Sequence, residues 1–334
     1  MPDDVANQPV DIDAANTLAT YRNYLTALST FTHNRYRGPG GLLQSLAKAQ
    51  RALNGFGRLG RLTSQPPGIR ELLFNAWHTE VALGLPQAYP DPGLIRYTNQ
   101  WAPVQAYYAV YSLWRAWFAI EDKHVRSHAK VLRSASSLIR ERALFPSPWN
   151  YACAGGYLLT DAQHIGFQSV QISDVSALST PGRHPVGDDW ASKALRTTRK
   201  FFLSQREDDW KSENRTRSGH PYRRIPPNRR QLIRRQLHPT TLFDFLYRLR
   251  IRSNYRDVDD FVSGQLRDAD ARRYFEGLLD FTQSTMLLVE AIIREALPHG
   301  QYEGHAQRFL SSSQAAKYSG LSRRLIALET TASP

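Results

Sequence analysis

The stretch Val104-Gln-Ala-Tyr-Tyr-Ala-Val-Tyr-Ser-Leu-Trp-Arg-Ala-Trp-Phe118 decides the fold class, because its apolar side chains recur at helical spacing. Residues 104, 107, 108, 111, 114 and 118, with the aliphatic stem of Arg115, form one broad apolar face of a helix. Pro103 suits the first turn of that helix, where a missing N–H leaves no hydrogen bond unmade. We expect so aromatic a helix in a packed core, with stacking on a ligand as the alternative.

The same rhythm recurs along most of the chain. Helices are predicted over residues 13–33, 41–55, 68–84, 101–121, 125–142, 189–210, 239–253, 256–263, 268–297 and 311–328. Between 145 and 190, Pro, Gly, Ser and Asp become frequent, and residues 166–172 alternate at a period of two, which predicts a short β-hairpin. The fold class predicted is therefore mainly α: a helical bundle with an irregular, possibly small-β insertion.

Composition and spacing suggest a division into four parts. These are an N-terminal helical region over 1–100, a helical bundle over 101–144 and 239–297, an irregular basic insertion over 145–238, and a C-terminal helical extension over 298–334. A chain of 334 residues can bury a sizeable core, and 41% hydrophobic residues exclude a mainly disordered protein.

The chain is strongly basic, with 43 Lys and Arg against 30 Asp and Glu and a formal net charge of +13. Such an excess favours an anionic partner, RNA or another nucleic acid above all. The alternative is that the charge only keeps the protein soluble.

Other functional classes lack their signatures. The single cysteine, Cys153, excludes an intramolecular disulfide and a Cys-based zinc site, and suits a reducing cytosol. No stretch has the roughly 18 to 20 apolar residues needed to span a bilayer, and Met1-Pro-Asp-Asp4 does not resemble a signal peptide. The sequence predicts a cytoplasmic protein, without a membrane partner. No phosphate-binding loop or metal-ligand spacing appears, so we expect no cofactor and no metal.

The segment 211–238 is the best electrostatic candidate for contact with nucleic acid. Between Lys211 and Arg235 it holds nine basic residues and one acid, Glu213. The arginines predicted to bind phosphate there are Arg223, Arg224, Arg229, Arg230, Arg234 and Arg235. Tyr222 and Trp210 are candidates for stacking on bases. The alternative is a solvated loop.

Three pieces of the sequence resemble the HEPN superfamily, of the YaaC-like or defence-associated kind. Ala106-Tyr-Tyr-Ala-Val-Tyr-Ser-Leu-Trp-Arg-Ala116 is similar to the family's aromatic helix. Arg126-Ser-His-Ala-Lys-Val-Leu132 looks like the start of the next helix in several of its groups. Tyr247-Arg-Leu-Arg-Ile-Arg-Ser-Asn-Tyr-Arg-Asp257 is similar to a later helix with an arginine, a short spacer and a polar residue.

The resemblance implies an α-helical bundle. Many members are metal-independent RNases of toxin or phage-defence systems, with a site assembled across a homodimer, and others bind nucleotides or protein partners. Active members usually carry a histidine shortly after the arginine. Here no histidine follows Arg252 at that distance, and an imidazole is the usual proton shuttle near neutral pH.

The resemblance nonetheless points to a candidate site. Arg252 would hold phosphate, Asn254 and Tyr255 would orient the reacting group, and His128 would shuttle protons from another helix. Arg248 and Arg256 would add phosphate contacts. Two alternatives remain open. In one, a solvated face paired with Asp257, Asp259 and Asp260 is formed by Arg248, Arg250, Arg252 and Arg256. In the other, the protein is a non-catalytic nucleic-acid- or nucleotide-binding scaffold. A homodimer and an antitoxin or defence-system partner are further expectations.

Overall fold

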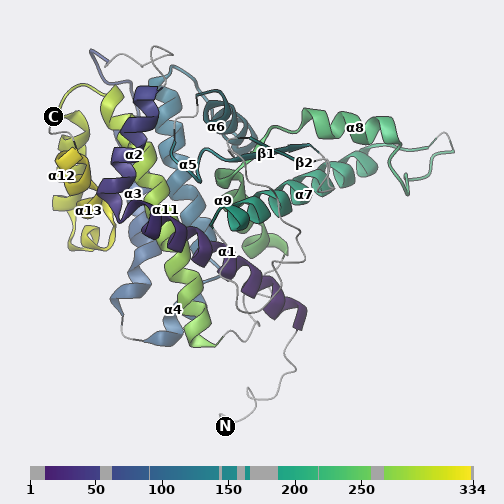
Figure 1. Cartoon of the computed structure of the whole chain (residues 1–334), viewed down its shortest axis with the longest axis horizontal. Coiled ribbons are helices and arrows are strands. Elements are labelled where there is room, and N and C mark those ends of the chain that lie inside the picture. The colour runs from purple at the N-terminus through teal and green to yellow at the C-terminus, as the bar shows by residue number, and fades with distance from the viewer. Residues whose placement is uncertain are drawn as a thin grey trace, which may run out of the picture. The chain divides into compact units, whose positions relative to one another are not determined.

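The computed structural model describes residues 12–52, 62–89, 91–142, 145–155, 162–165, 187–216, 218–256 and 267–331, and Figure 1 draws their helices and strands. The protein is mainly α-helical with a small sheet, which confirms the predicted fold class. It divides into two compact units. Unit 1 comprises Met1–Leu43, Leu59–His124 and Leu249–Pro334, and unit 2 comprises Gln44–Arg58 and Val125–Arg248.

These boundaries, near residues 124 and 248, differ from those suggested by composition. The four-part division is based on the local composition of the sequence, whereas the two units are groups of residues that pack against one another in space. The four-part division therefore stays a prediction.

Unit 1 is built from helices. They are α1 Ile12–Tyr36, the first part of α2 Pro39–Ala52, α3 Ile69–Gly84, the 3₁₀ turn η1 Leu85–Ala88, α4 Pro92–Thr98, α5 Ala102–Ile120, the π-helical turn η4 Arg252–Arg256, α11 Asp268–Ala296, α12 Gln301–Ser312, the 3₁₀ turn η5 Gln314–Tyr318 and α13 Leu321–Thr331. Helix α5 packs against α3 and α11, and α1 packs along α11.

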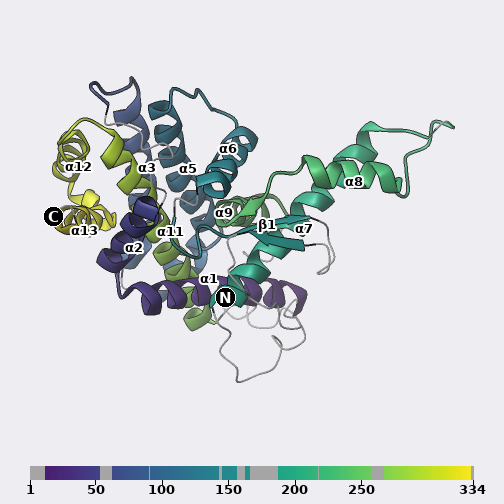
Figure 2. The same cartoon turned by 45° about the horizontal axis from the view of Figure 1, so that its top comes forward.

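Unit 2 combines helices with a small antiparallel sheet. Its elements are α6 His128–Arg142, β1 Ala152–Gly155, β2 Ala162–Ile165, α7 Gly187–Glu213, α8 Pro227–Gln236, β3 Thr240–Thr241 and most of α9 Leu242–Ile251. The strand order is β2-β1-β3, and Ala152 pairs with both Ile165 and Thr241. Strand β1 lies against α7 (Figure 2). The hairpin predicted over residues 166–172 lies outside the described residues.

The aromatic stretch at 104–118 forms most of α5, and most of its large side chains are buried as predicted. Tyr107, Trp114 and Phe118 are at most 1% exposed. Trp114 and Phe118 stack with ring centroids 5.7 Å apart. The aromatic helix is therefore core, and the ligand-stacking alternative is wrong for these three rings.

The final predicted helix, 311–328, is wrong as a single element, because the chain turns at Gly320 between η5 and α13. A β-carbon at Gly320 would lie 2.6 Å from Gln283 Nε2 and 2.9 Å from Arg324 Nη1. The turn thus brings backbone close against α11, a tertiary constraint that helical periodicity does not encode. Asp91 caps α4 by accepting a hydrogen bond from Gly93 N at 2.8 Å.

A buried ion cluster joins three helices of unit 1. Arg324 of α13 donates to both carboxylate oxygens of Glu80 on α3, at 2.6 and 2.8 Å, and to both oxygens of Glu290 on α11, at 2.7 and 3.0 Å. Trp77 Nε1 donates to Glu290 and Gly320 N to Glu80, each at 2.8 Å. Burial by itself would lower the pKa of Arg324, but the charges of Glu290 and Glu80 raise it well above its ordinary value. The guanidinium therefore stays charged.

Arg324→Met should destabilise the protein by about 3–5 kcal/mol, because two buried carboxylates would lose their shared counter-ion. Arg323→Met is the matched control: its side chain is exposed, and we expect a change within about 0.5 kcal/mol. Urea denaturation followed by tryptophan fluorescence measures both. A loss below about 1 kcal/mol for Arg324→Met would contradict the role assigned to the cluster.

Every helix in the described ranges is too short or too polar to traverse a lipid bilayer.

Candidate nucleic-acid interface

Helices α7 and α8 of unit 2 pack side by side, and the segment between them closes into a turn (Figure 1). Arg215 and Pro221 form an antiparallel bridge, and Thr216 N donates to His220 O at 2.8 Å. The rings of Trp210 and Tyr222 meet with centroids 4.9 Å apart. Part of the segment 211–238 is thus folded, and the loop alternative is wrong for residues 227–236, which form α8.

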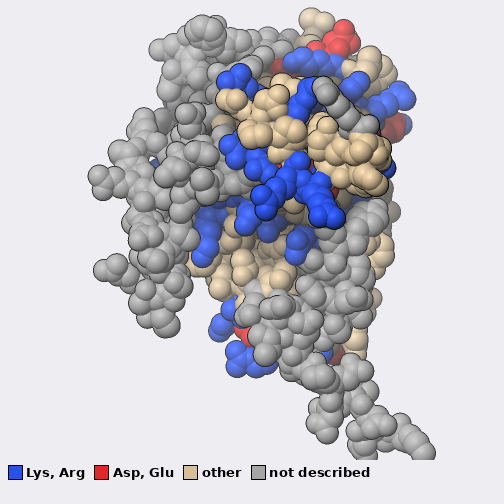
Figure 3. All heavy atoms as spheres, turned by 90° about the vertical axis from the view of Figure 1, so that its right-hand side faces the viewer, with Lys and Arg blue, Asp and Glu red and all other residues tan. Residues whose placement is uncertain are grey.

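Helix α8 is a strongly basic surface helix. Its sequence, Pro227-Asn-Arg-Arg-Gln-Leu-Ile-Arg-Arg-Gln236, contains no acid, and none of its residues is buried. Pro226 and Pro227 favour its start, since proline at the first turn leaves no hydrogen bond unmade. In Figure 3, which looks onto the side where α8 lies, Lys and Arg side chains gather with few acidic atoms beside them.

The six arginines predicted here fall into two groups. Arg223, Arg224, Arg229 and Arg235 are exposed, and no acidic side chain pairs with them in the part of the chain that the structure describes. We call these four the arginine face. Arg230 instead forms an ion pair with Glu207 of α7 at 3.1 Å, and Arg234 is half-buried. Only the first group has its full charge available to an outside anion.

A buried arginine of α7 holds the end of α8 in place. Arg199 is 2% exposed. It donates to the carbonyl oxygens of Arg234 at 3.2 Å, His238 at 2.9 Å and Cys153 at 3.4 Å. Burial lowers the pKa of Arg199 and raises the pKa of the Cys153 thiol. Because Arg234 lies in the last turn of α8, the guanidinium also sits where the helix dipole favours a cation.

Asp244 organises the start of α9. Its carboxylate is fully buried and accepts hydrogen bonds from Thr241 N at 2.7 Å, Thr241 Oγ1 at 2.9 Å and Ser136 Oγ at 3.1 Å. His238 Nε2 lies 2.8 Å from its other oxygen. The bond from Thr241 N to the Asp244 carboxylate is one of the two hydrogen bonds of a capping box, in which an acidic side chain of the first turn accepts from the backbone N–H of the cap residue.

The helix that resembles the HEPN family is less exposed than a solvated face would be. Arg248 donates to Thr197 Oγ1 at 2.7 Å and lies 5.8 Å from the centre of the Phe201 ring. Arg250 is 8% exposed, and its Nη2 donates to Tyr108 Oη at 3.2 Å. The solvated-face alternative is therefore wrong for Arg248 and Arg250. Arg250, in the last turn of α9 that belongs to unit 1, thus contacts α5.

Of the candidate catalytic residues, Arg252, Asn254 and Tyr255 belong to unit 1 and His128 belongs to unit 2. Arg252 and Asn254 are half-buried in the π-helical turn η4, which packs against α5. Tyr255 and Arg256 continue that turn, but their side chains lie outside the described residues, as do Asp257, Asp259 and Asp260. His128 begins α6 in unit 2, with its ring centroid 5.9 Å from that of Tyr247. The proposed roles of all these residues stay predictions.

Two residues that organise unit 2 were missed by sequence reasoning. The spacing Thr241-x-x-Asp244 is a capping signal and could have revealed Asp244. Arg199 carries no such signal, because an arginine within a helical pattern usually predicts a solvent-exposed position. In the described residues no group of three or more His, Cys, Asp or Glu could hold a metal ion.

Comparison of the chain with protein-family models, with curated proteins and with solved structures found no match. The resemblance to the HEPN superfamily thus rests on the three quoted pieces of sequence.

Arg199→Met should loosen the attachment of α8, because the carbonyl groups of Arg234, His238 and Cys153 would lose a donor. We expect destabilisation of about 2–4 kcal/mol and faster labelling of the buried Cys153 thiol by a chromogenic disulfide reagent. Lys200→Met, which changes the exposed neighbouring residue, is the control and should leave both values near wild type. Equal labelling rates in the two variants would argue against the bracing role of Arg199.

Proposed function

We propose that the protein binds RNA through the arginine face of unit 2. The observation that carries the proposal is that four exposed arginines, none paired with an acid in the described residues, share one folded segment. Guanidinium groups suit phosphate because they donate two parallel hydrogen bonds and never lose their charge near neutral pH. The net charge of +13 acts in the same direction by attracting a polyanion.

The contrast between free and paired arginines supports this choice of surface. Arg230 and Arg248 are already engaged with Glu207 and Thr197, so binding phosphate would require them to give up existing contacts. Arg229 and Arg235 give up only water and counter-ions. Their contribution to RNA affinity should therefore come mostly from the release of counter-ions, and this contribution becomes smaller as the salt concentration rises.

Arg229→Gln combined with Arg235→Gln should weaken binding to a single-stranded RNA and flatten its salt dependence. Each lost phosphate contact should reduce the slope of log affinity against log salt by roughly 0.7. Fluorescence polarisation over a salt series measures both effects. The control is Arg272→Gln with Arg273→Gln, which removes the same charge from exposed positions of α11 in unit 1. Equal losses in the two double variants would refute the arginine face as the binding surface.

A second candidate function is metal-independent RNA cleavage of the HEPN type. The observation that favours it is the π-helical turn η4, which falls on the segment that resembles the family. Single π-helical turns within helices occur often at functional sites. This proposal also includes a homodimer, a toxin or phage-defence role, an antitoxin partner and a cytoplasmic location. Without cleavage, the non-catalytic binding or scaffold function remains.

Incubation with total RNA in EDTA separates the two functions. Cleavage by the wild type that is lost in Arg252→Ala, with RNA binding retained, would support a metal-independent RNase, since arginine can stabilise the charge that develops on phosphate. A gel shift without cleavage would leave the binding function alone. Cleavage that is undiminished in a folded Arg252→Ala protein would remove Arg252 from the proposed site.

A further inference from the structure

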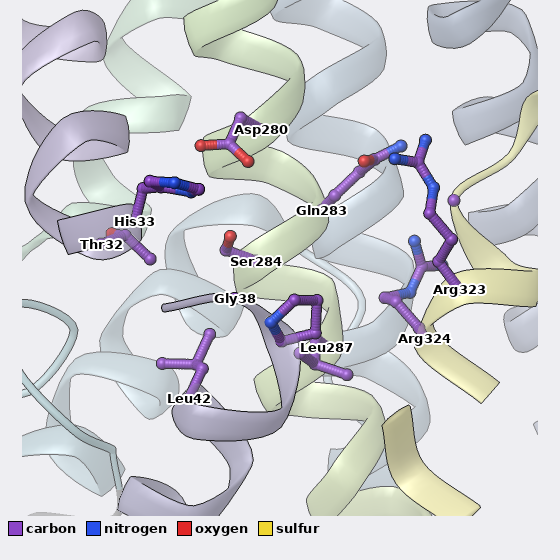
Figure 4. A pocket seen from close by; sticks show the side chains of 12 residues that line it. Thr32, His33, Gly38, Leu42, Asp280, Gln283, Ser284, Leu287, Arg323 and Arg324 are labelled. Atoms are coloured by element: carbon purple, nitrogen blue, oxygen red, sulfur yellow. The ribbon is translucent and has the colours of Figure 1, made fainter. Parts of the chain in front are cut away.

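A cavity of about 180 Å³ in unit 1 adjoins the buried Arg324 and the turn at Gly320. Its walls come from the end of α1, the turn into α2, the middle of α11 and the start of α13 (Figure 4). Leu42, Leu287 and Pro39 give it an apolar part, and His33, Asp280, Gln283, Ser284 and Arg323 give it polar groups. Small-molecule sites typically combine an apolar lining with a few convergent polar groups.

The backbone around this cavity departs from ordinary geometry in ways that need particular residues. Arg37 has φ 51° and Gly38 has φ 109°, so two successive residues turn through the left-handed half of conformational space. A β-carbon at Gly41 would lie 1.9 Å from Tyr36 O. A left-handed arginine is energetically unfavourable and persists only where its surroundings enforce it. The α1–α2 turn is thus held in one tight shape at the cavity wall.

The polar groups of the cavity are available to a ligand. Within the described part of the chain, the side chains of His33, Gln283, Ser284 and Arg323 make no hydrogen bond or ion pair. Asp280 accepts one hydrogen bond, from Ser29 Oγ to its Oδ2, which leaves Oδ1 free. By contrast, Arg324 is engaged with Glu80 and Glu290 and is not available.

The polar and charged side chains of the cavity lie in two groups, one at each end. Figure 4 shows His33, Asp280 and Ser284 gathered on one side and Gln283 with the arginines on the other. Asp280 makes the first end an acceptor for a cation, and Arg323 makes the second end a donor to an anion. A ligand with an ammonium group at one end and an anionic group at the other therefore matches both ends of the cavity.

We propose that this cavity binds a free aliphatic α-amino acid. Its ammonium group would lie at Asp280 and Ser284, its carboxylate at Arg323, and its side chain against Leu42 and Leu287. The size agrees, because a cavity of about 150 Å³ holds benzene, whereas drug-sized ligands occupy roughly 300–1,000 Å³. The inference is independent of RNA binding, since the cavity and the arginine face belong to different units.

Thermal unfolding of the full-length protein with each natural L-amino acid at millimolar concentration tests the proposal, followed by calorimetric titration. At least one aliphatic amino acid should raise Tm by about 2 °C or more. Its N-acetyl derivative, which lacks the ammonium charge, should have no effect, and its decarboxylated amine should bind more weakly. Asp280→Asn and Arg323→Gln should each reduce affinity at least about tenfold, because each removes one charged partner.

Glu276→Gln is the matched control, since it neutralises an exposed acid on α11 one turn before Asp280. It should leave the affinity unchanged. The proposal is overturned if no amino acid binds, if binding survives both Asp280→Asn and Arg323→Gln, or if the N-acetyl derivative or inorganic phosphate binds equally well. Because both variants change exposed side chains, each should unfold at nearly the wild-type temperature without ligand, so that lost binding does not reflect lost folding.

Discussion

Unit 1 depends on a single guanidinium shared between two buried carboxylates. Glu80, Glu290 and Arg324 come from three helices far apart in the sequence, and each carboxylate also accepts a hydrogen bond from a second donor. Their charges tolerate burial only when all three groups are in place, since any one alone would lose its hydration without compensation. The cluster therefore selects one arrangement of α3, α11 and α13, while the apolar core supplies most of the attraction between them.

In unit 2 a buried arginine is held by neutral backbone groups. Arg199 donates hydrogen bonds to carbonyl oxygens of α8, β1 and the segment before β3. The two units thus bury arginine in different ways, one against full charges and one against backbone dipoles. Other arginines lie at the surface. Whether such an arginine is paired with an acid decides whether its charge is available to an anion.

Local features were predictable from the sequence, and long-range pairings were not. The periodicity around α5 predicted a buried helix because apolar spacing records which face meets the core. The six arginines between 223 and 235 were found by charge density, but their division into free and paired groups depends on Glu207 of α7. Likewise, the sequence near Arg324 does not indicate that Glu80 and Glu290 are its partners. The interruption of the helix at Gly320 reflects the close approach of Gln283. Such pairings exist only after tertiary packing.

The attachment of α8 has a consequence for how its surface can change. Arg199 reaches the helix through the carbonyl oxygen of Arg234, a group that every amino acid possesses. Substitutions at the exposed positions of α8 therefore leave this anchor untouched. Such a helix is a natural scaffold for altered specificity, since its outward side chains are free to vary, by selection or by engineering, with little effect on the hydrogen bonds that hold the helix in place.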